Sequence, residues 1–300
     1  MLPNGPTTPR PSASLIVVNA KNEVLLVHRN PKATSFSGMH VFPGGNYDAK
    51  QDKSFQFTAI RETFEETGLL LASSRREGAS PIPLPDETLD SARAAVHSNT
   101  LSLLKFLENH ELKPDVELLL PLTQWITPEN ALRRFHTHFF IAFLPAAPST
   151  GFSSGHVRYR LPTPDGGQEV VEARFIHPAA ALAKFSAGCI LLMPPQYYLL
   201  TTLASILQGG SASATQHAQV EALATGAFGR MVVNPRPWSG SDVPNGYTCL
   251  TYEGDETRGG PAGQLHRSVL RLTNGVPTEI ALYRNFDIFT KIPDSPQSKL

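Results

Sequence analysis

The chain has 300 residues, of which 41% are hydrophobic, so it can form one large domain or one and a half. Its 26 basic side chains balance 26 acidic ones, and this zero net charge predicts no nucleic-acid partner. Two cysteines exclude a disulfide framework, and no apolar run approaches the roughly 20 residues that span a bilayer, so we expect no membrane span.

The first third of the chain predicts a hairpin followed by a helix. Residues 1–12 are rich in Pro and Thr and lack the apolar core of a secretion signal, which predicts a disordered lead-in. Two short apolar runs, residues 14–19 and 23–28, flank a turn-prone stretch and predict paired strands. An extended segment then ends at a glycine pair, and residues 52–70 carry apolar side chains at helical spacing, with Asp52 or Ser54 as the cap.

The rest of the chain alternates between helical and extended patterns. Residues 87–111 predict one long helix, the main part of a helical insertion at about residues 86–112. Three strands are expected after it, at residues 118–125, 135–144 and 169–175. Two helices are expected to follow, at residues 178–185 and 195–207. A Gly- and Ser-rich linker at 209–214 predicts a domain boundary at residue 208. Beyond it, residues 230–234, residues 247–252 and a hairpin at Asn274–Gly275 predict a small β-rich extension over residues 209–300.

The segment with the most chemical information is Arg-Glu-Thr-Phe-Glu-Glu-Thr-Gly-Leu at residues 61–69. On a helix, Glu62, Glu65 and Glu66 share one face, because they are three and four residues apart. Arg61 lies four residues before Glu65 and is placed to steady it. Clustered carboxylates repel one another, and a hard divalent cation such as Mg²⁺ or Mn²⁺ would remove that repulsion.

Three glutamates on one helix face are most often a solvated acidic surface. The glycine pair Gly44–Gly45 before the helix favours a binding site instead. Two adjacent glycines allow the backbone to approach a ligand closely and leave amides and carbonyls free to contact it.

These residues resemble the Nudix box, over residues 44–69. Phe42-Pro43-Gly44-Gly45 and the segment from Arg61 to Leu69 match the box pattern, with Thr63 at an aliphatic position. Fifteen residues separate Gly45 from Arg61, two more than the pattern has, and its first glutamate is missing, with Asp48 or Asp52 as possible replacements. The resemblance implies an α/β fold of the α+β kind, an α/β/α sandwich with a mixed sheet over residues 13–208.

The same resemblance implies the roles of the site residues. Glu62, Glu65, Glu66 and the carbonyl of Gly45 would hold one to three Mg²⁺ or Mn²⁺ ions, and Arg61 would orient Glu65. The substrate's phosphates would contact the glycine pair, and nearby basic side chains are candidates for the same role. These residues are Gly44, Gly45, Arg29 and Arg134. Two carboxylates outside the box, Glu117 and Glu172, are further candidates for a general base, although each is more often a surface residue.

Further segments resemble one branch, the peroxisomal coenzyme A diphosphatases of animals. They are residues 38–45, Trp125-Ile-Thr-Pro128, residues 134–140 and Pro194-Pro195-Gln196. The branch implies hydrolysis of coenzyme A or acyl-coenzyme A to 4′-phosphopantetheine, or its acyl form, and adenosine 3′,5′-bisphosphate. Two alternatives remain open, namely a Nudix pyrophosphatase for NADH or ADP-ribose and a catalytically silent nucleotide-binding domain.

The last three residues, Ser298-Lys299-Leu300, form the tripeptide that addresses proteins to peroxisomes. Prolines and small polar residues before it favour an accessible tail. We therefore expect a peroxisomal import receptor as a partner and the peroxisomal matrix as the location.

Overall fold

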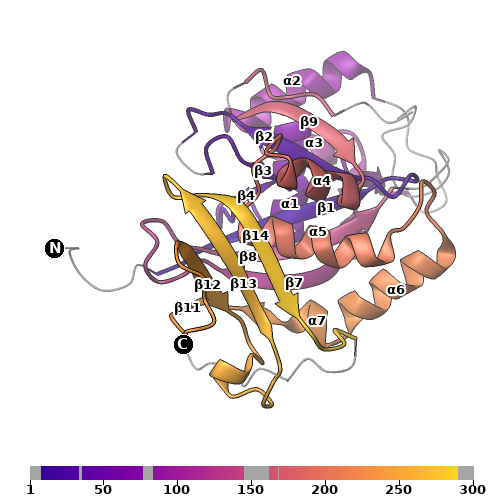
Figure 1. Ribbon diagram of the computed structural model, residues 1–300. Coiled ribbons are helices and arrows are strands. Elements are labelled where there is room, and N and C mark those ends of the chain that lie inside the picture. The colour runs from indigo at the N-terminus through magenta and orange to yellow at the C-terminus, as the bar shows by residue number, and fades with distance from the viewer. Residues whose placement is uncertain (1–7, 34–35, 77–83, 145–161, 168, 290–300) are drawn as a thin grey trace.

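The computed structural model describes residues 8–33, 36–76, 84–144, 162–167 and 169–289 (Figure 1). Its centre is an eight-stranded sheet in which β10, β7, β8, β1, β2 and β3 are neighbours in that order, while β4 pairs with β1 and β9 with β2. The β1–β8 and β7–β10 pairs are parallel and the others antiparallel, so the sheet is mixed. The strands are β1 (Arg10–Val18), β2 (Val24–Arg29), β3 (His40–Val41), β4 (Gly44–Asn46), β7 (Leu120–Ile126), β8 (Phe135–Phe143), β9 (Val170–Ile176) and β10 (Val232–Val233).

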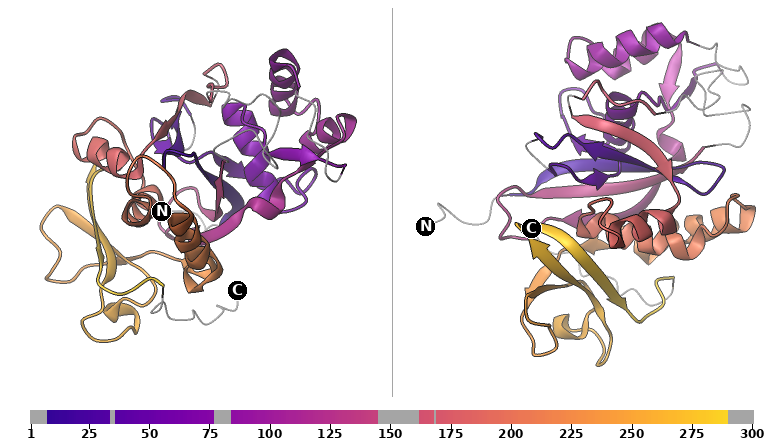
Figure 2. Two further views of the ribbon diagram at one scale, coloured as in Figure 1. Left: turned by 90° about the vertical axis from the view of Figure 1, so that its right-hand side faces the viewer. Right: turned by 45° about the horizontal axis from the view of Figure 1, so that its top comes forward.

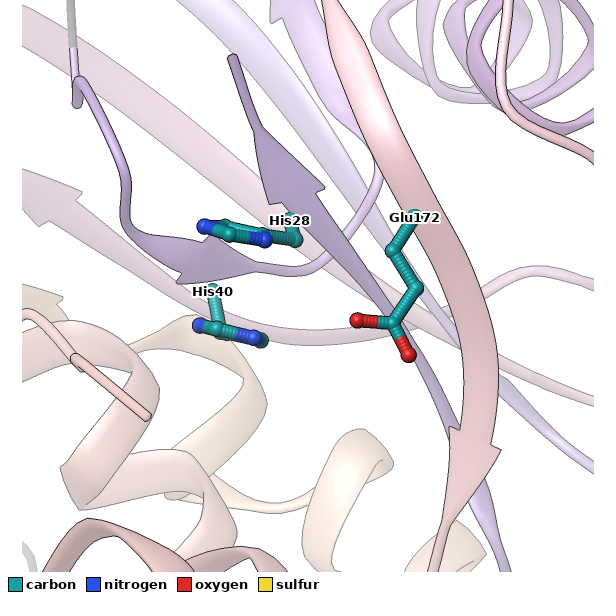
Figure 3. Close-up of side chains that lie close together, drawn as sticks. All are labelled: His28, His40 and Glu172. Atoms are coloured by element: carbon teal, nitrogen blue, oxygen red, sulfur yellow. The ribbon is translucent and has the colours of Figure 1, made fainter. Parts of the chain in front are cut away.

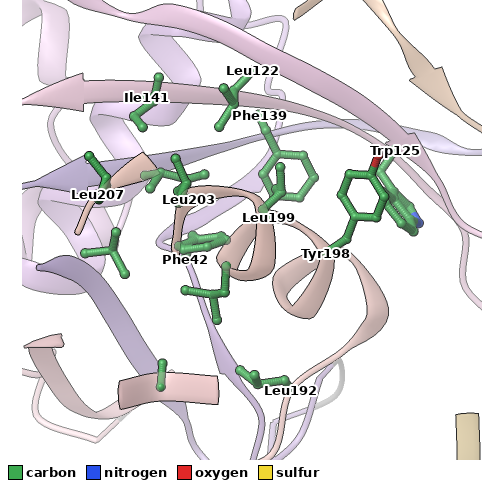
Figure 4. Close-up of a cluster of buried hydrophobic side chains, with 14 of the residues drawn as sticks. Phe42, Leu122, Trp125, Phe139, Ile141, Leu192, Tyr198, Leu199, Leu203 and Leu207 are labelled. Carbon is green, nitrogen blue, oxygen red and sulfur yellow. The ribbon is translucent and has the colours of Figure 1, made fainter. Parts of the chain in front are cut away.

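The central strand β1 is buried on both faces. Ile16 and Val18 belong to one hydrophobic cluster, whereas Leu15 and Val17 belong to another, because neighbouring side chains of a strand point to opposite faces. Each cluster is completed by helices, and Figure 4 shows Leu199 and Leu203 packed within the first one. The predicted α/β/α sandwich with a mixed sheet is therefore confirmed.

The helices form the two outer layers. On one face lie α1 (Phe55–Thr67), α2 (Asp86–His97) and α3 (Leu103–Asn109), with the small β5–β6 pair (Ala72–Ser74, Leu112–Pro114) beside them. On the other face lie α4 (Pro178–Ser186), α5 (Pro194–Ile206), α6 (Ala214–Thr225) and α7 (Ala227–Arg230). No helix within the described ranges has both the length and the apolar character needed to cross a membrane.

Two predictions about the amino-terminal half are corrected. The single helix over residues 87–111 is wrong, because the chain leaves α2 through Asn99 in the left-handed region (φ 57°) and Ser102 caps the new helix α3. The disordered lead-in is too long, since β1 begins at Arg10 and pairs with β8 from that residue on. Residues 1–7 lie outside the described ranges.

The carboxyl-terminal segment forms a second, antiparallel sheet of β11 (Arg236–Trp238), β12 (Tyr247–Thr251), β13 (His266–Thr273) and β14 (Val276–Arg284). The predicted hairpin is present, with Asn274 and Gly275 both at positive φ in its turn. The strand predicted at residues 230–234 does not belong to this extension, because β10 pairs with β7 of the central sheet. Both views of Figure 2 place the second sheet at the end of the molecule opposite α2.

Candidate active site

Helix α1 presents the acidic residues because its two ends are fixed by local hydrogen bonds. The Phe57 amide donates to Ser54 Oγ (3.1 Å) at the start, so Ser54 rather than Asp52 is the cap. At the end, Gly68 adopts a left-handed conformation (φ 72°) and its amide donates to the Phe64 carbonyl (2.8 Å). Ile60 and Phe64 are buried in the core, so the opposite side of the helix carries the carboxylates.

Arg61 connects two of the three predicted carboxylates. Its Nη1 lies 2.9 Å from Glu62 Oε1 and 2.7 Å from Glu65 Oε1. The guanidinium is 4% exposed, and its Nη2 also donates to the Asn46 carbonyl (3.0 Å). The predicted contact between Arg61 and Glu65 is therefore present, and Glu62 shares it.

Asp52 anchors Arg61 from the opposite side. Arg61 Nε and Nη2 donate to its two carboxylate oxygens at 2.8 and 2.9 Å, a two-point contact between fully buried groups. The same carboxylate accepts from Thr58 Oγ1 and from the Asp48 amide, both at 2.9 Å. Of the two proposed replacements for the missing glutamate, Asp52 is the one that contacts Arg61. Asp48 instead accepts from Lys50 and Gln51 within its own turn.

Glu66 joins the helix to two strands. Its Oε1 lies 2.8 Å from Arg29 Nη1, and its Oε2 accepts from the Gly44 amide (3.0 Å). Arg29 also pairs with Glu169 (2.9 Å), which immediately precedes β9. Our sequence reasoning missed Glu169, because nothing local indicates that a segment 140 residues away pairs with β2.

The glycine pair is required by close packing. A Cβ atom on Gly45 would lie 2.5 Å from the carboxyl carbon of Glu62, and one on Gly44 would lie 2.4 Å from the Ala13 carbonyl oxygen. Pairing of β4 with β1, which sets Gly45 opposite Ala13, holds the loop there. The close backbone approach predicted for Gly44 and Gly45 is therefore an approach to α1 and β1 of the protein itself.

Burial makes the charged state of these glutamates costly. It raises the pKa of Glu62 to about 7, an effect that Arg61 opposes and the neighbouring Glu65 reinforces. Burial likewise raises the pKa of Glu66 well above its usual range, against the opposing influence of Arg29. A bound cation would stabilise the charged form of both groups.

The residues present suit hard divalent cations, which take oxygen ligands. Among the described residues, only a group on β2, β3 and β9 places three potential ligand atoms within 4.8 Å of one another, so the box carboxylates stand farther apart. Each of them is instead fixed by an arginine. Carboxylates at this spacing could hold more than one divalent ion.

A cavity of about 400 Å³ opens beside Glu65. Helix α2 forms one wall, where His97 Nδ1 lies 3.6 Å from Glu65 Oε2 and Arg93 Nε donates to the Glu65 carbonyl (2.8 Å). Residues 163–166 form another wall, to which Arg93 also donates. The predicted helical insertion thus reaches the carboxylates through α2, while Leu103, Phe106 and Leu107 of α3 pack in the core.

The remaining residues considered in the sequence make other contacts or lie outside the described ranges. Arg134 is 8% exposed just before β8, where its Nε donates to the Thr127 carbonyl (3.1 Å), and its role in substrate binding stays a prediction. Trp125 is a core residue in contact with Tyr198 and Tyr252. The tripeptide Ser298, Lys299 and Leu300 lies outside the described residues.

Comparison with known proteins identifies relatives that match part of this chain. A family model described as the NUDT19 Nudix domain matches residues 50–203. The chain is 30% identical over 164 residues to "Acyl-coenzyme A diphosphatase NUDT19" of Gallus gallus, an alignment that covers 50% of this chain and 40% of that protein. It is also 30% identical over 203 residues to "Putative nudix hydrolase 7" of Caenorhabditis elegans, covering 66% of this chain and 61% of the relative. The matches thus span between two fifths and about three fifths of these relatives.

A solved structure supports the fold. A Nudix hydrolase from Alicyclobacillus acidocaldarius superposes with a TM-score of 0.54 at 23% identity, covering 70% of this chain and 96% of that one.

Proposed function

This chain belongs to the NUDT19 Nudix family, and on that premise we propose that it hydrolyses the diphosphate of coenzyme A or acyl-coenzyme A. The products would be 4′-phosphopantetheine, or its acyl form, and adenosine 3′,5′-bisphosphate. The Gallus gallus relative is named an acyl-coenzyme A diphosphatase, which supports this substrate class.

One observation carries the proposal. Glu62, Glu65 and Glu66 are held in place by two arginines on the side of α1 that meets Gly44 and Gly45. A solvated acidic surface does not explain why a buried or partly buried arginine fixes each carboxylate, since exposed ion pairs contribute little. Next to this cluster lies a cavity with room for part of a substrate.

Glu62, Glu65, Glu66 and the Gly45 carbonyl would hold Mg²⁺ or Mn²⁺, which when bound neutralises the diphosphate and activates water. The chain's own residues supply positioning. Arg61, anchored by Asp52, sets the direction of Glu62 and Glu65, while Arg29 and the Gly44 amide set that of Glu66. The cavity beside Glu65 would take the part of the substrate next to the diphosphate.

Product analysis tests the proposal. The purified protein is incubated with Mg²⁺ and, in separate reactions, with coenzyme A, acetyl-coenzyme A, NADH and ADP-ribose, and the products are resolved by chromatography. Adenosine 3′,5′-bisphosphate from the first two supports the proposal. AMP from NADH or ADP-ribose alone would assign the other pyrophosphatase activity, and binding without turnover would assign a silent nucleotide-binding domain.

Variants connect the activity to the carboxylates. We expect Glu65→Gln and Glu66→Gln to lower kcat by about 100-fold or more, because each loses a negative ligand. Glu221→Gln on the exposed side of α6 is the matched control and should retain the wild-type rate. Circular dichroism checks that each variant is folded, and near-wild-type rates in both box variants would refute the assignment.

The same proposal includes a location. Ser298-Lys299-Leu300 would be bound by a peroxisomal import receptor and bring the enzyme into the peroxisomal matrix. Removal of Leu300 should then leave a fluorescently tagged protein in the cytosol.

A further inference from the structure

Three potential metal ligands lie in one row across the central sheet. His28 of β2 is directly opposite His40 of β3 on one side and Glu172 of β9 on the other. Residues paired in this way point to the same face, with Cβ atoms about 5 Å apart. One ligand atom from each of the three side chains lies within 4.8 Å of the other two. Figure 3 shows the Glu172 carboxylate directed toward the two imidazoles.

This row is on the opposite face of the sheet from the proposed active site. Arg29, the next residue along β2, extends to Glu66 of α1. Leu26, two residues before His28 in the regular part of β2, belongs to the hydrophobic cluster that contains α5, so His28 points to that same face. Phe42, two residues after His40, likewise belongs to the hydrophobic cluster on that face. The row is therefore separate from the box carboxylates.

We propose that His28, His40 and Glu172 bind a divalent transition-metal ion, with Zn²⁺ the best match. Two imidazoles and one carboxylate form a donor set that zinc takes in proteins, with water in the fourth position. His40 is 6% exposed, and its Nδ1 has no hydrogen-bond partner in the described part of the chain. A buried nitrogen without a partner is costly, and a metal ion on the row would supply one.

The chemistry of the row favours a soft-to-borderline ion over Mg²⁺. Neutral imidazole suits zinc, copper or nickel, whereas the oxygen-rich site on the other face suits Mg²⁺ or Mn²⁺. The two faces of the sheet would thus select different ions.

Binding requires a small rearrangement of the side chains. The two imidazole rings are stacked with centroids 4.3 Å apart and planes 8° from parallel, whereas ligand atoms around a tetrahedral zinc ion lie about 3.4 Å apart. His28 and Glu172 are only partly buried and can rotate. Glu172 must also give up its ion pair with Arg174 (3.1 Å), which is partly exposed and therefore weak.

Bound zinc would stabilise the strands that position the proposed active site. His28 immediately precedes Arg29, which holds Glu66, and His40 lies four residues before Gly44. An ion linking β3, β2 and β9 would resist separation of these strands. Such an ion would stabilise these strands, and its binding does not depend on the proposed hydrolysis.

Calorimetric titration of the full chain with Zn²⁺, in the presence of excess Mg²⁺ to occupy the carboxylate site, tests this inference. We expect one zinc site in the wild type, affinity at least about 10-fold weaker in Glu172→Gln, and no site in His28→Gln. Because Glu172 is partly exposed, its variant should fold normally. Zinc should also raise the Tm of the wild type but not that of His28→Gln.

Two matched controls distinguish the row from other histidines and carboxylates. His136 and His138 form a second stacked pair, with centroids 4.9 Å apart, so His136→Gln should leave zinc affinity unchanged. Glu221→Gln is the carboxylate control. Absence of zinc binding by the wild type, or equal losses in His28→Gln and His136→Gln, would overturn the proposal whether or not the protein hydrolyses coenzyme A.

Discussion

At the scale of single residues, Asp52 and Arg61 determine how the carboxylates are presented. Asp52 is fully buried and contacts Arg61 at two points, and Arg61 in turn pairs with Glu62 and Glu65. We expect Asp52→Asn to lower the free energy of unfolding by about 2–3 kcal/mol, because it removes the charge of the carboxylate that contacts the buried Arg61 guanidinium at two points, while Glu62 and Glu65 remain. Activity should fall as well, since Arg61, which fixes both Glu62 and Glu65, is then held less firmly. Urea unfolding and kcat measure the two effects.

Asp48 provides the matched control for this prediction. It lies in the same loop, but among the described residues its carboxylate accepts from the Lys50 amide and the Gln51 side chain and does not contact Arg61. Asp48→Asn should therefore cost about 1 kcal/mol or less and leave kcat close to that of the wild type. If Asp48→Asn proved as damaging as Asp52→Asn, the role given to Asp52 would be incorrect.

At the scale of secondary-structure elements, local patterns predicted most of what surrounds the carboxylates. Helix α1, its glycine terminus and the β1–β2 hairpin follow from spacing, caps and turn residues that lie close together in sequence. The choice between Asp48 and Asp52 could not be made, because it depends on the path of a loop with two additional residues. Glu169 and the row of His28, His40 and Glu172 depend on β9 pairing with β2, a long-range contact without a local signal.

The break between α2 and α3 gives a prediction at the same scale. Asn99 adopts φ 57°, a region that glycine occupies freely and that alanine does not. We expect Asn99→Ala to lower the free energy of unfolding by about 1 kcal/mol relative to Asn99→Gly. Both variants lose the weak contact from Gln51 (3.4 Å), so the difference isolates the backbone. Equal stability of the two in urea would show that the left-handed turn is not maintained.

At the scale of the whole molecule, one hydrophobic core joins the second sheet to the central domain. Leu250, Tyr252 and Leu270 of the carboxyl-terminal segment belong to the same cluster as Leu199 and Leu203 of α5. The surfaces where the second sheet packs on α5 form a junction, and a polar contact crosses it too: Arg284 Nη1 of β14 donates to Thr202 Oγ1 of α5 (2.9 Å). The predicted boundary at residue 208 therefore separates segments that bury each other's apolar surface, and we expect them to unfold together.

His266 makes this junction sensitive to acid. Its Nδ1 donates to the Glu253 carbonyl, so in the neutral ring Nε2 accepts from the Tyr198 hydroxyl (2.8 Å). Burial lowers its pKa from 6.5 to about 4, against a raising effect of the Glu253 hydrogen bond. The unfolded chain therefore binds this proton more readily than the folded one. The stabilisation is complete above about pH 6.5 and is lost as the pH falls toward 4, a change on the order of 3 kcal/mol.

Urea unfolding between pH 7.5 and 4 measures this effect, at pH steps of about 0.5. We expect His266→Gln to be less stable than the wild type near pH 7 but to lose less stability on acidification, because no buried imidazole remains there to be protonated. Tyr198→Phe keeps the ring and removes only the hydroxyl, so acid sensitivity should persist if burial is its main cause. Burial also lowers the pKa values of His40 and His138 to about 4, so these residues will add the same loss of stability with falling pH in every variant. An identical pH dependence in the wild type and His266→Gln would therefore show that the junction does not control acid unfolding.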